Sequence, residues 1–489
     1  MSKGYKQAVP LKLPNIERVK IDSSRTKTVV LGNYDECELI IGFVGAVGTK
    51  MQLIISQFID QLTKNHGYHD NETIKVSKEF LEPILDKYTA EDAKRRIDGC
   101  HCTKVEALMD VGNWLREKTD NGIIAMGIAS RIAEKRKPPE TPFNRKVFFI
   151  DSIKHPAEVE ILRKIYGEGF YLVGVYEDKQ KRLQNLIGRI LVDDNGKPLN
   201  KSQREEYAKR LIERDECEEN DFGQHTREAF QQSDFFIDIT NSDSTGSINR
   251  FVDLIFGHPF FTPTFGEYAM YMAYSASLRS ADLSRQVGAV VCKENDILAM
   301  GTNDVPKYGG GLYWMDIEKS SGEYKDAVNG RDYMVGYDSN KSELIKMTRD
   351  LLQRLQIIDT KPVEDPLDIS DIKEYLPLVK KSRLGELTEY GRIVHAEMEA
   401  LMSCARSNVS SIGTDVYVTT FPCHNCAKHI IAAGVRKVVY IEPYPKSKTF
   451  SFYSDSTTQD QKEKDEKVLF TPFFGVGPSR FKDFFAMTN

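Results

Sequence analysis

The sequence lacks any long apolar run. No stretch approaches the ~20 apolar residues that a helix needs to span a bilayer, which argues against a membrane-spanning protein. It also lacks an excess of positive charge, because 67 Lys and Arg face 72 Asp and Glu, for a net charge of −5. That balance argues against a polynucleotide-binding surface spread over the chain, although it leaves room for a local basic pocket.

The sequence also lacks a secretory leader. Eight cysteines without such a leader indicate a reducing compartment, so we expect a cytoplasmic protein without membrane attachment. The 489 residues are 40% hydrophobic and 28% charged, which is typical of a globular protein with two or three domains.

The most informative stretch runs from residue 394 to residue 434. His395, Cys423 and Cys426 offer three ligands, the number a catalytic zinc ion uses when its fourth position is kept for water. Glu397 follows His395 by two residues, so it can reach that water without binding the metal. The combination of H-x-E with P-C-x-x-C is the signature of zinc-dependent nucleobase deaminases.

The local pattern supports a catalytic site. Residues 398–405 and 427–433 predict helices, and residues 415–420 and 436–442 predict strands. The two cysteines therefore open a helix, where main-chain N–H groups favour the thiolate. The alternative is a structural zinc knuckle or a pair of inert thiols. A structural site would need a fourth protein ligand, and neither His424 nor His429 is well placed to provide one.

Four segments carry a family resemblance: SADLSRQVGAVV (280–291), GTND (301–304), HAE (395–397) and FPCHNCAKHIIAAGVRKVVY (421–440). They resemble the deoxycytidylate deaminase family over most of residues 266–489. The whole chain resembles bacterial two-domain deoxycytidylate deaminases, including the anti-phage enzymes that deplete dCTP and dCMP. The resemblance implies Zn²⁺ as cofactor, free deoxycytidine nucleotides as substrates and a homo-oligomer, often a hexamer.

The resemblance also implies substrate contacts. Asn303 would hydrogen-bond the sugar, although GTND would equally suit a turn asparagine. The main chain of Ala396 would meet the edge of the base, and Arg285 and Lys446 are candidates for the phosphate.

A glycine-rich segment marks the first half of the chain. Residues 38–41 predict a strand, 42–50 a turn and 51–62 a helix, which is the arrangement that cradles phosphate at a helix N-terminus. The P-loop pattern is imperfect, because the lysine is displaced by one residue. The segment is therefore either a nucleotide site or an ordinary tight turn. Its candidate contacts are Gly42, Gly45, Gly48, Thr49 and Lys50.

Further alternating units follow in the first half. Residues 146–151, 171–176 and 234–239 predict strands and 155–166 a helix, so we expect a parallel sheet. Asp151 ends its strand where a magnesium-linked carboxylate would lie. The region resembles the P-loop nucleotide kinase fold. The basic segment 179–214 would then be a lid, or otherwise a solvated helix pair.

The predicted fold class is α/β. We expect an arm (1–36), an N-terminal P-loop kinase-like domain with a parallel sheet (37–250) and a C-terminal cytidine-deaminase-like αβα domain (258–489). Residues 305–390 form an insertion within it. Residues 333–340 would approach the active site or a neighbouring subunit, and 341–358 predict an amphipathic helix with an apolar stripe. Residues 473–478 predict a closing turn, and Cys100-His101-Cys102 reads as loop or core.

Three functions remain open. The first is a free-nucleotide deaminase, either one that depletes dCTP in antiviral defence or a housekeeping enzyme that supplies dUMP. The second is an RNA- or DNA-editing deaminase, which the net charge disfavours. The third is a nucleotide-sensing module, plausible for the first half. In the antiviral case the N-terminal domain would be regulatory, with a second nucleotide or phosphorylated ligand as effector, or an inhibitory RNA.

Overall fold

A computed structural model of the chain describes residues 37–85, 103–136, 143–192, 197–216, 223–240, 244–258, 260–318, 322–359, 365, 367–380, 382–387, 389–442 and 447–486. The predicted arm at 1–36, the Cys100-His101-Cys102 group and Lys446 lie outside these residues. Within the described part of the chain, no helix combines the length and the apolar character that crossing a membrane would require.

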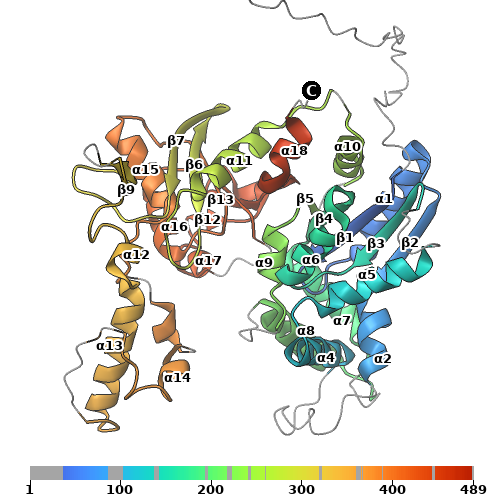
Figure 1. Cartoon of the computed structure of the whole chain (residues 1–489), viewed down its shortest axis with the longest axis horizontal. Helices are drawn as coiled ribbons and strands as arrows, with labels where there is room; N and C mark the ends of the chain where they lie inside the picture. The colour runs from blue at the N-terminus through green and yellow to red at the C-terminus, as the bar shows by residue number, and fades with distance from the viewer. Residues whose placement is uncertain are drawn as a thin grey trace, which may run out of the picture.

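A six-stranded sheet organises the first half (Figure 1). Its order is β14-β5-β4-β1-β3-β2, and all neighbouring strands are parallel except β14, which runs antiparallel to β5. The strands are β1 (Leu39–Gly45), β2 (Asp70–Lys75), β3 (Lys146–Asp151), β4 (Phe170–Tyr176), β5 (Phe235–Asp238) and β14 (Gly475–Val476). The predicted parallel sheet is thus confirmed.

Helices cover both faces of this sheet, because successive side chains of a strand point to opposite sides. Ile40 and Val44 of β1 pack in one hydrophobic cluster, and Leu39, Ile41 and Phe43 pack in another. The helical segments are α1 (Met51–His66), η2 (Ser77–Leu81), α2 (Glu82–Leu85), α4 (Lys104–Lys118), α5 (Ile123–Lys135), α6 (Pro156–Tyr166), η3 (Gly167–Gly169), α7 (Lys179–Arg189), α8 (Lys201–Glu216), α9 (Thr226–Gln231) and α10 (Thr245–Ile255).

A second six-stranded sheet, of order β12-β13-β11-β10-β6-β7, organises the second half. The β6–β7 and β6–β10 pairs are antiparallel and the others are parallel. Its strands are β6 (Gly288–Lys293), β7 (Asp296–Thr302), β10 (Asp415–Val418), β11 (Lys437–Tyr440), β12 (Thr457–Thr458) and β13 (Val468–Pro472). Strand β13 lies inside this sheet, because β12 pairs on its outer side.

Three helices cover this second sheet and give it an αβα arrangement. Helix α11 (Phe265–Ser277) begins with the capping box of Thr264 and Glu267 and packs against one face. Helices α15 (Ala396–Arg406) and α16 (His424–Ala432) pack against the other face. The remaining helical segments of this half are α17 (Thr449–Phe452), η5 (Gln461–Glu463), η6 (Pro478–Arg480) and α18 (Phe481–Phe485).

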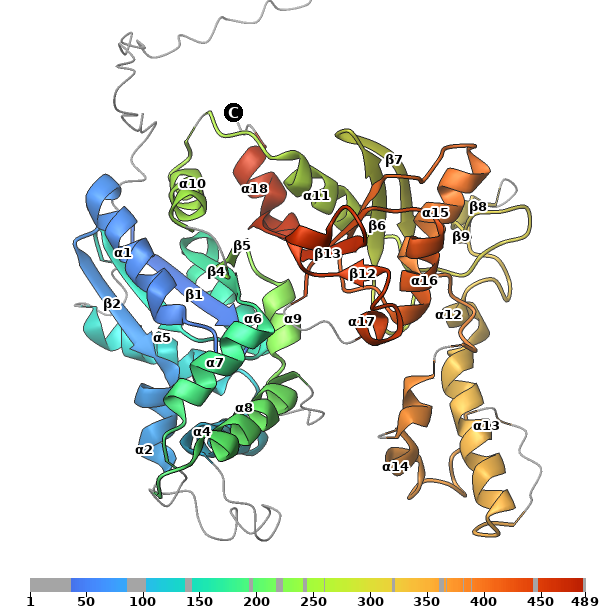
Figure 2. The ribbon, with the colours of Figure 1, turned by 180° about the vertical axis from the view of Figure 1, so that it is seen from behind.

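The insertion projects away from the second sheet (Figures 1 and 2). It contains β8 (Asp316–Ile317), β9 (Tyr324–Lys325), α12 (Asp332–Val335), α13 (Ser339–Arg354), α14 (Leu376–Lys380) and η4 (Arg383–Glu386). The predicted amphipathic helix is present, but its predicted stripe of Leu344, Met347, Leu351, Leu352 and Leu355 is only partly right. Leu351 and Leu355 are exposed, because α13 buries a narrow face, centred on Ile345 and Leu352, against Ile372 and Leu376.

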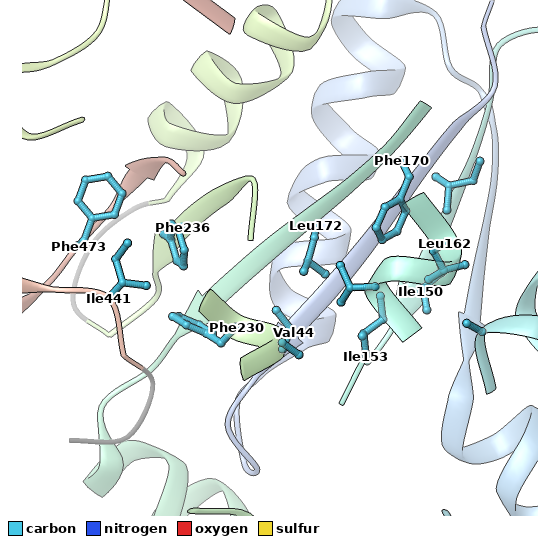
Figure 3. Close-up of a cluster of buried hydrophobic side chains, with 14 of the residues drawn as sticks. Val44, Ile150, Ile153, Leu162, Phe170, Leu172, Phe230, Phe236, Ile441 and Phe473 are labelled. Atoms are coloured by element: carbon cyan, nitrogen blue, oxygen red, sulfur yellow. The ribbon is translucent and has the colours of Figure 1, made fainter. Parts of the chain in front are cut away.

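The two halves share one hydrophobic cluster (Figure 3). Phe230 and Phe236 come from the first half, and Ile441 and Phe473 come from the second. The rings of Phe236 and Phe473 lie 5.7 Å apart in an edge-to-face contact. Residues 473–478, predicted as a closing turn, therefore continue into β14 and complete the first sheet. Strand β14 thus comes from the second half of the sequence but pairs in the sheet of the first half. The predicted domain boundaries stay predictions.

Helix α15 lies so close to β7 that only glycine fits at residue 301. A Cβ atom on Gly301 would lie 2.2 Å from the carbonyl oxygen of Ala396 and 2.4 Å from the nitrogen of Ala400. We expect Gly301→Ala to push α15 outward and to lower the free energy of unfolding by about 1–3 kcal/mol, as overpacking does. Chemical denaturation measures the change.

Gly246→Ala is the matched control, because Gly246 lies in α10 and a Cβ atom added there would have nothing within 4 Å. Alanine there should be neutral or should stabilise by up to about 1 kcal/mol. Equal unfolding free energies for the two variants would contradict the close packing of α15 on β7.

Candidate active site

Three predicted metal ligands meet at the first turns of α15 and α16. His395 is the N-cap residue of α15, Cys423 is the N-cap residue of α16, and Cys426 lies in the first turn of α16. The Nδ1 atom of His395 lies 3.2 Å from Sγ of Cys426 and 3.4 Å from Sγ of Cys423. Among the described residues, these three side chains form a group whose ligand atoms lie close enough together to share one metal ion.

The spacing of these atoms fits a tetrahedral zinc ion. Bonds of about 2.0 Å to nitrogen and 2.3 Å to sulfur place such ligand atoms roughly 3.5 Å apart. The main-chain N–H of Cys426 also donates to the sulfur of Cys423, at 3.4 Å. Three protein ligands leave one coordination position for water or substrate, which is the pattern of a catalytic site.

The electrostatics of the two cysteines favour a metal-binding thiolate. The pKa of Cys423 falls to about 3, because the thiol of Cys426 and the ring of His395 hydrogen-bond to its sulfur. The pKa of Cys426 is raised, chiefly by the same hydrogen bond and by burial. A bound dication would favour the thiolate form of both cysteines.

Glu397 lies beside the ligands in a buried position. It is 3% exposed, and burial raises the pKa of its carboxyl group, while the charge of His395 acts in the opposite direction. A raised pKa favours a carboxyl group that can both take up and release a proton, which general acid–base catalysis requires.

A cavity of about 250 Å³ adjoins this group. Arg285, Asn303 and Ala396, all predicted substrate contacts, lie in its wall together with His395, Glu397 and Cys423. Among the described residues that line it, Arg285 is the one lysine or arginine, and its side chain is exposed.

The amide of Asn303 is already engaged with the protein. Its Nδ2 donates to Oδ2 of Asp282 and to the carbonyl oxygen of Arg285, both at 2.8 Å. Its Oδ1 accepts the main-chain N–H of Val287 at 2.7 Å. Both amide hydrogens are used, so a lone pair on Oδ1 remains for a sugar hydroxyl.

The insertion supplies wall residues that the sequence indicated only in part. Asp338 and Asn340 line the cavity, and both belong to segment 333–340. The sequence left open whether this segment approaches the active site or a neighbouring subunit. Asp332 also lines it and pairs with Arg392 at 3.2 Å. No motif marks Asp332, which reaches the site through the fold of the insertion.

The glycine-rich loop of the first half is shorter than predicted. Gly42 lies inside β1, where a Cβ atom would meet the side chain of Ile153 at 2.5 Å, so it is a packing glycine and not part of the loop. The chain leaves the sheet at Gly45, Gly48 has a φ of 89°, and Lys50 is exposed at the start of α1.

Carboxylates of the chain itself cap this loop. The N–H of Val47 donates to Asp215 at 2.8 Å, and the N–H of Lys50 donates to Glu177 at 3.0 Å. The ammonium of Lys154 bonds to the carbonyl oxygen of Gly45 at 2.9 Å and lies 3.3 Å from Asp215. A lysine remote in sequence thus provides positive charge at the loop, which the displaced Lys50 does not.

A cavity of about 390 Å³ lies next to this loop. Gly45, Gly48 and Thr49 line it, together with Asp151 and Lys154. Asp151 accepts a hydrogen bond from Gln52 at 2.8 Å, and burial raises the pKa of its carboxyl group. The predicted carboxylate and the predicted loop therefore face the same space.

The basic segment 179–214 forms α7 and α8, and α7 covers the loop. A Cβ atom on Gly48 would lie 2.7 Å from the carbonyl oxygen of Arg182, and Asn185 donates to the carbonyl oxygen of Gly48 at 3.0 Å. Leu186 is buried. These contacts do not fit the alternative of a fully solvated helix pair.

Comparison with known proteins locates a family match in the second half. Residues 263–442 match the family described as the cytidine and deoxycytidylate deaminase zinc-binding region. That region contains the three ligands, so the cofactor is Zn²⁺. A solved dCMP deaminase from cyanophage S-TIM5, in complex with dCMP and dUMP, overlaps 44% of this chain and 99% of its own, with 21% identity and a TM-score of 0.23. At that score the overlap supports no further argument.

Three curated relatives share parts of this region. The ComE operon protein 2 of Bacillus subtilis is 38% identical over 81 residues, which cover 16% of this chain and 42% of that protein. The deoxycytidylate deaminase of phage T4 is 29% identical, over 37% of this chain and 78% of its own length. That of phage T2 is 46% identical over 181 residues, which cover 37% of this chain and 80% of the phage protein. By these matches the chain belongs to the deoxycytidylate deaminase family.

Proposed function

We propose that this protein deaminates free deoxycytidine nucleotides, dCMP, dCTP or both, by zinc-dependent hydrolysis at C4 of cytosine. The observation that carries the proposal is the group of His395, Cys423 and Cys426 beside the buried carboxyl of Glu397, in the wall of one cavity. The names of the phage T2 and T4 relatives support dCMP as a substrate.

The residues of the site divide the chemistry among them. When bound, the zinc ion makes water acidic enough to provide a nucleophile at neutral pH. Glu397 takes the proton of that water and delivers it to N3 of the cytosine. It then takes the remaining proton of the hydroxyl added at C4 and delivers it to the departing amino group, so that dCMP and water give dUMP and ammonia. The main chain of Ala396 lies in the cavity wall, where it can meet the edge of the base.

The charges around the cavity favour a small substrate over a polynucleotide. Asp282, Asp332 and Asp338 line it, and Arg285 is its one described arginine or lysine. A polynucleotide would bring a row of phosphates to this acidic wall, whereas nucleic-acid-binding surfaces neutralise phosphates with many basic side chains. A single nucleotide can place its phosphate at Arg285.

The decisive experiment gives purified protein dCMP, dCTP, CMP, CTP and a cytosine-containing single-stranded oligonucleotide, and follows the products by chromatography. We expect turnover of one or both deoxynucleotides. Turnover of dCMP alone would favour a housekeeping supply of dUMP, and turnover of dCTP would favour depletion of the pool. Activity confined to the oligonucleotide would contradict the proposal.

Glu397→Gln supplies the internal control for this assay. We expect it to keep the zinc and the fold and to lower turnover by roughly 10²–10⁴-fold, the usual contribution of a general acid–base group. Glu399→Gln is matched to it, because Glu399 lies on the same helix and pairs with Arg406 at 2.5 Å, away from the cavity lining. It should retain most activity.

Removal of a ligand tests the metal site. We expect Cys423→Ala to lose zinc and activity together, because two remaining protein ligands bind the ion weakly. Elemental analysis measures the zinc content per chain. Cys404→Ala is the control, since Cys404 is a buried cysteine of α15 outside the ligand group. One zinc ion per chain in the Cys423 variant would refute the assignment.

The first half is proposed to regulate the deaminase through a nucleotide or other phosphorylated ligand at residues 45–50, in a P-loop kinase-like domain. The N–H groups of Val47 and Lys50 are the donors that would bind phosphate oxygens there, and Asp215 and Glu177 now accept them. A phosphate would have to displace these carboxylates. That competition supports a switch more than continuous phosphoryl transfer.

Helix α9 offers a route from this loop to the deaminase half. Thr226, at its start, donates to Asp215 at 3.4 Å. The next residue, Arg227, lies 2.8 Å from Glu442, which follows β11 in the second half. Burial raises the pKa of Glu442 to about 8, although the charges of Arg227 and Arg285 act in the opposite direction. Consecutive residues of α9 thus contact Asp215, which caps the loop, and Glu442 of the second half.

The wider proposal follows the resemblance to anti-phage deaminases. Such a switch would keep dCTP consumption low until infection changes the nucleotide pool or removes an inhibitor, such as a cognate RNA. Assembly as a homo-oligomer, by resemblance a hexamer, and a cytoplasmic location belong to the same proposal.

Arg227→Gln tests the coupling between the halves. We expect nucleotides bound at the first half to shift the apparent substrate affinity of the unmodified protein by about 5–150-fold, the usual range of allosteric coupling. The variant should lose most of that shift, since its contact to Glu442 is weakened. Deamination rates across a panel of nucleotides provide the measurement.

Arg131→Gln is the matched control, because Arg131 pairs with Glu79 at 3.2 Å within the first half. It should keep the response. The regulatory proposal fails if no nucleotide changes the rate of the unmodified protein, or if both variants respond as it does.

A further inference from the structure

The loop between α11 and β6 carries Arg285, and hydrogen bonds from one residue just after the neighbouring strand β7 hold this loop in place. Asn303 follows β7, and its side chain contacts three points of the loop: the carboxylate of Asp282, the carbonyl of Arg285 and the N–H of Val287. Its main-chain N–H also donates to the carbonyl of Val287, at 3.2 Å. Asn303 is 5% exposed, so these bonds are shielded from water.

Asp282 holds the same loop together with Asn303. Its Oδ1 accepts both the main-chain N–H and the hydroxyl of Ser284, each at 2.7 Å. Its Oδ2 accepts the amide of Asn303 at 2.8 Å. The carboxylate of Asp282 therefore links Ser284, which precedes Arg285, to Asn303, which binds the carbonyl oxygen of Arg285. Although Asp282 lines the cavity, three hydrogen bonds inside the protein stabilise its carboxylate.

Arg285 lies where two spaces meet. It lines the active-site cavity and also an adjoining cavity of about 320 Å³, whose wall includes Gln231 of the first half. Its charge acts against the burial that raises the pKa of Glu442.

An exposed arginine loses rotamer freedom when it binds a phosphate, which weakens binding. A fixed main chain does not remove that cost, but it fixes the origin of the side chain and limits the region the guanidinium can reach. The loop is anchored on both sides of Arg285 by Asp282 and Asn303, while the side chain itself stays exposed.

We propose that Asp282 is a positioning residue for the substrate phosphate: through Asn303 it fixes the main chain of Arg285, so that the guanidinium faces the phosphate of a deoxycytidine nucleotide. This inference rests on the proposed deamination of phosphorylated deoxycytidine. Asn303 then serves phosphate recognition through its two amide hydrogens, in addition to any contact of its remaining Oδ1 lone pair with the sugar.

The test compares a substrate that has a phosphate with one that lacks it. The kcat/KM for dCMP or dCTP, whichever is turned over faster, is divided by the kcat/KM for deoxycytidine. Asp282→Asn is nearly isosteric but places a second amide donor against that of Asn303. We expect it to lower this ratio by about 10- to 100-fold, mainly through the KM of the nucleotide, as loss of a charge-assisted contact does.

Arg285→Ala separates positioning from general damage. It should lower the ratio at least as much as Asp282→Asn, and adding Asp282→Asn to it should lower the ratio no further, because the two changes act on one contact. Competitive inhibition by dUMP and by deoxyuridine gives a corresponding ratio of inhibition constants, which reports on binding alone. Zinc content and thermal melting of each variant report whether the fold is retained.

The outcomes separate this inference from the proposed function. An equal loss with the nucleotide and with deoxycytidine, or an additive effect in the double variant, would overturn the positioning role while leaving the deaminase intact. An unchanged ratio in Asp282→Asn would overturn it as well. If the unmodified protein deaminates no deoxycytidine compound, the proposed function itself fails.

Discussion

The packing of α15 and α16 on one face of the second sheet is the constraint on which the active site depends. His395, Cys423 and Cys426 lie at the first turns of these helices, so the distances between their ligand atoms are set by how the helices lie on the strands. Gly301 lets the main chain of α15 approach β7, and Glu397 follows His395 on that same turn. The positions of the candidate metal ligands and of Glu397, the proposed acid–base group, are thereby fixed by main-chain packing, and small shifts of this packing would change the distances between them.

A second constraint joins the two halves of the chain. Glu267 closes the capping box of α11, pairs with Arg250 of the first half at 2.7 Å and accepts the N–H of Val476 at 2.8 Å. Strand β14 completes the first sheet beside it, and Phe484 packs against Phe251 with ring centroids 5.9 Å apart. Full burial of a phenylalanine such as Phe251 contributes roughly 1.5–3 kcal/mol, and the partly buried Phe484 contributes less. The second half therefore depends on the first for part of its packing.

The charges near the active site show how a cavity with several carboxylates can serve an anionic substrate. Asp282 accepts hydrogen bonds from Ser284 and Asn303, and Asp332 pairs with Arg392. These contacts hold the two carboxylates within the wall, while Arg285 stays exposed. The insertion adds part of this wall, so the shape of the cavity is particular to a chain that carries it.

The grouping of the site residues and the class of the fold could be predicted from local sequence. His395, Glu397, Cys423 and Cys426 lie close in sequence at the starts of helices, so local spacing was enough to predict that they come together, with the strands and helices around them. Contacts between remote segments could not be predicted in this way. The role of Gly42 was misjudged because the length of β1 depends on its neighbours, and the exposed Leu351 and Leu355 reflect how little α13 has to pack against.

Which remote groups meet is a property of the folded chain. Strand β14 is two residues long and pairs with β5, more than 230 residues earlier, and so short an element has no periodic signal of its own. The same holds for Asp215 at the glycine-rich loop, for Arg227 at Glu442 and for Asp282 at Asn303. Each is an ordinary charged residue in the sequence. Its role arises from the partner that the fold brings to it, because hydrogen bonds and ion pairs depend on distances that linear spacing does not encode.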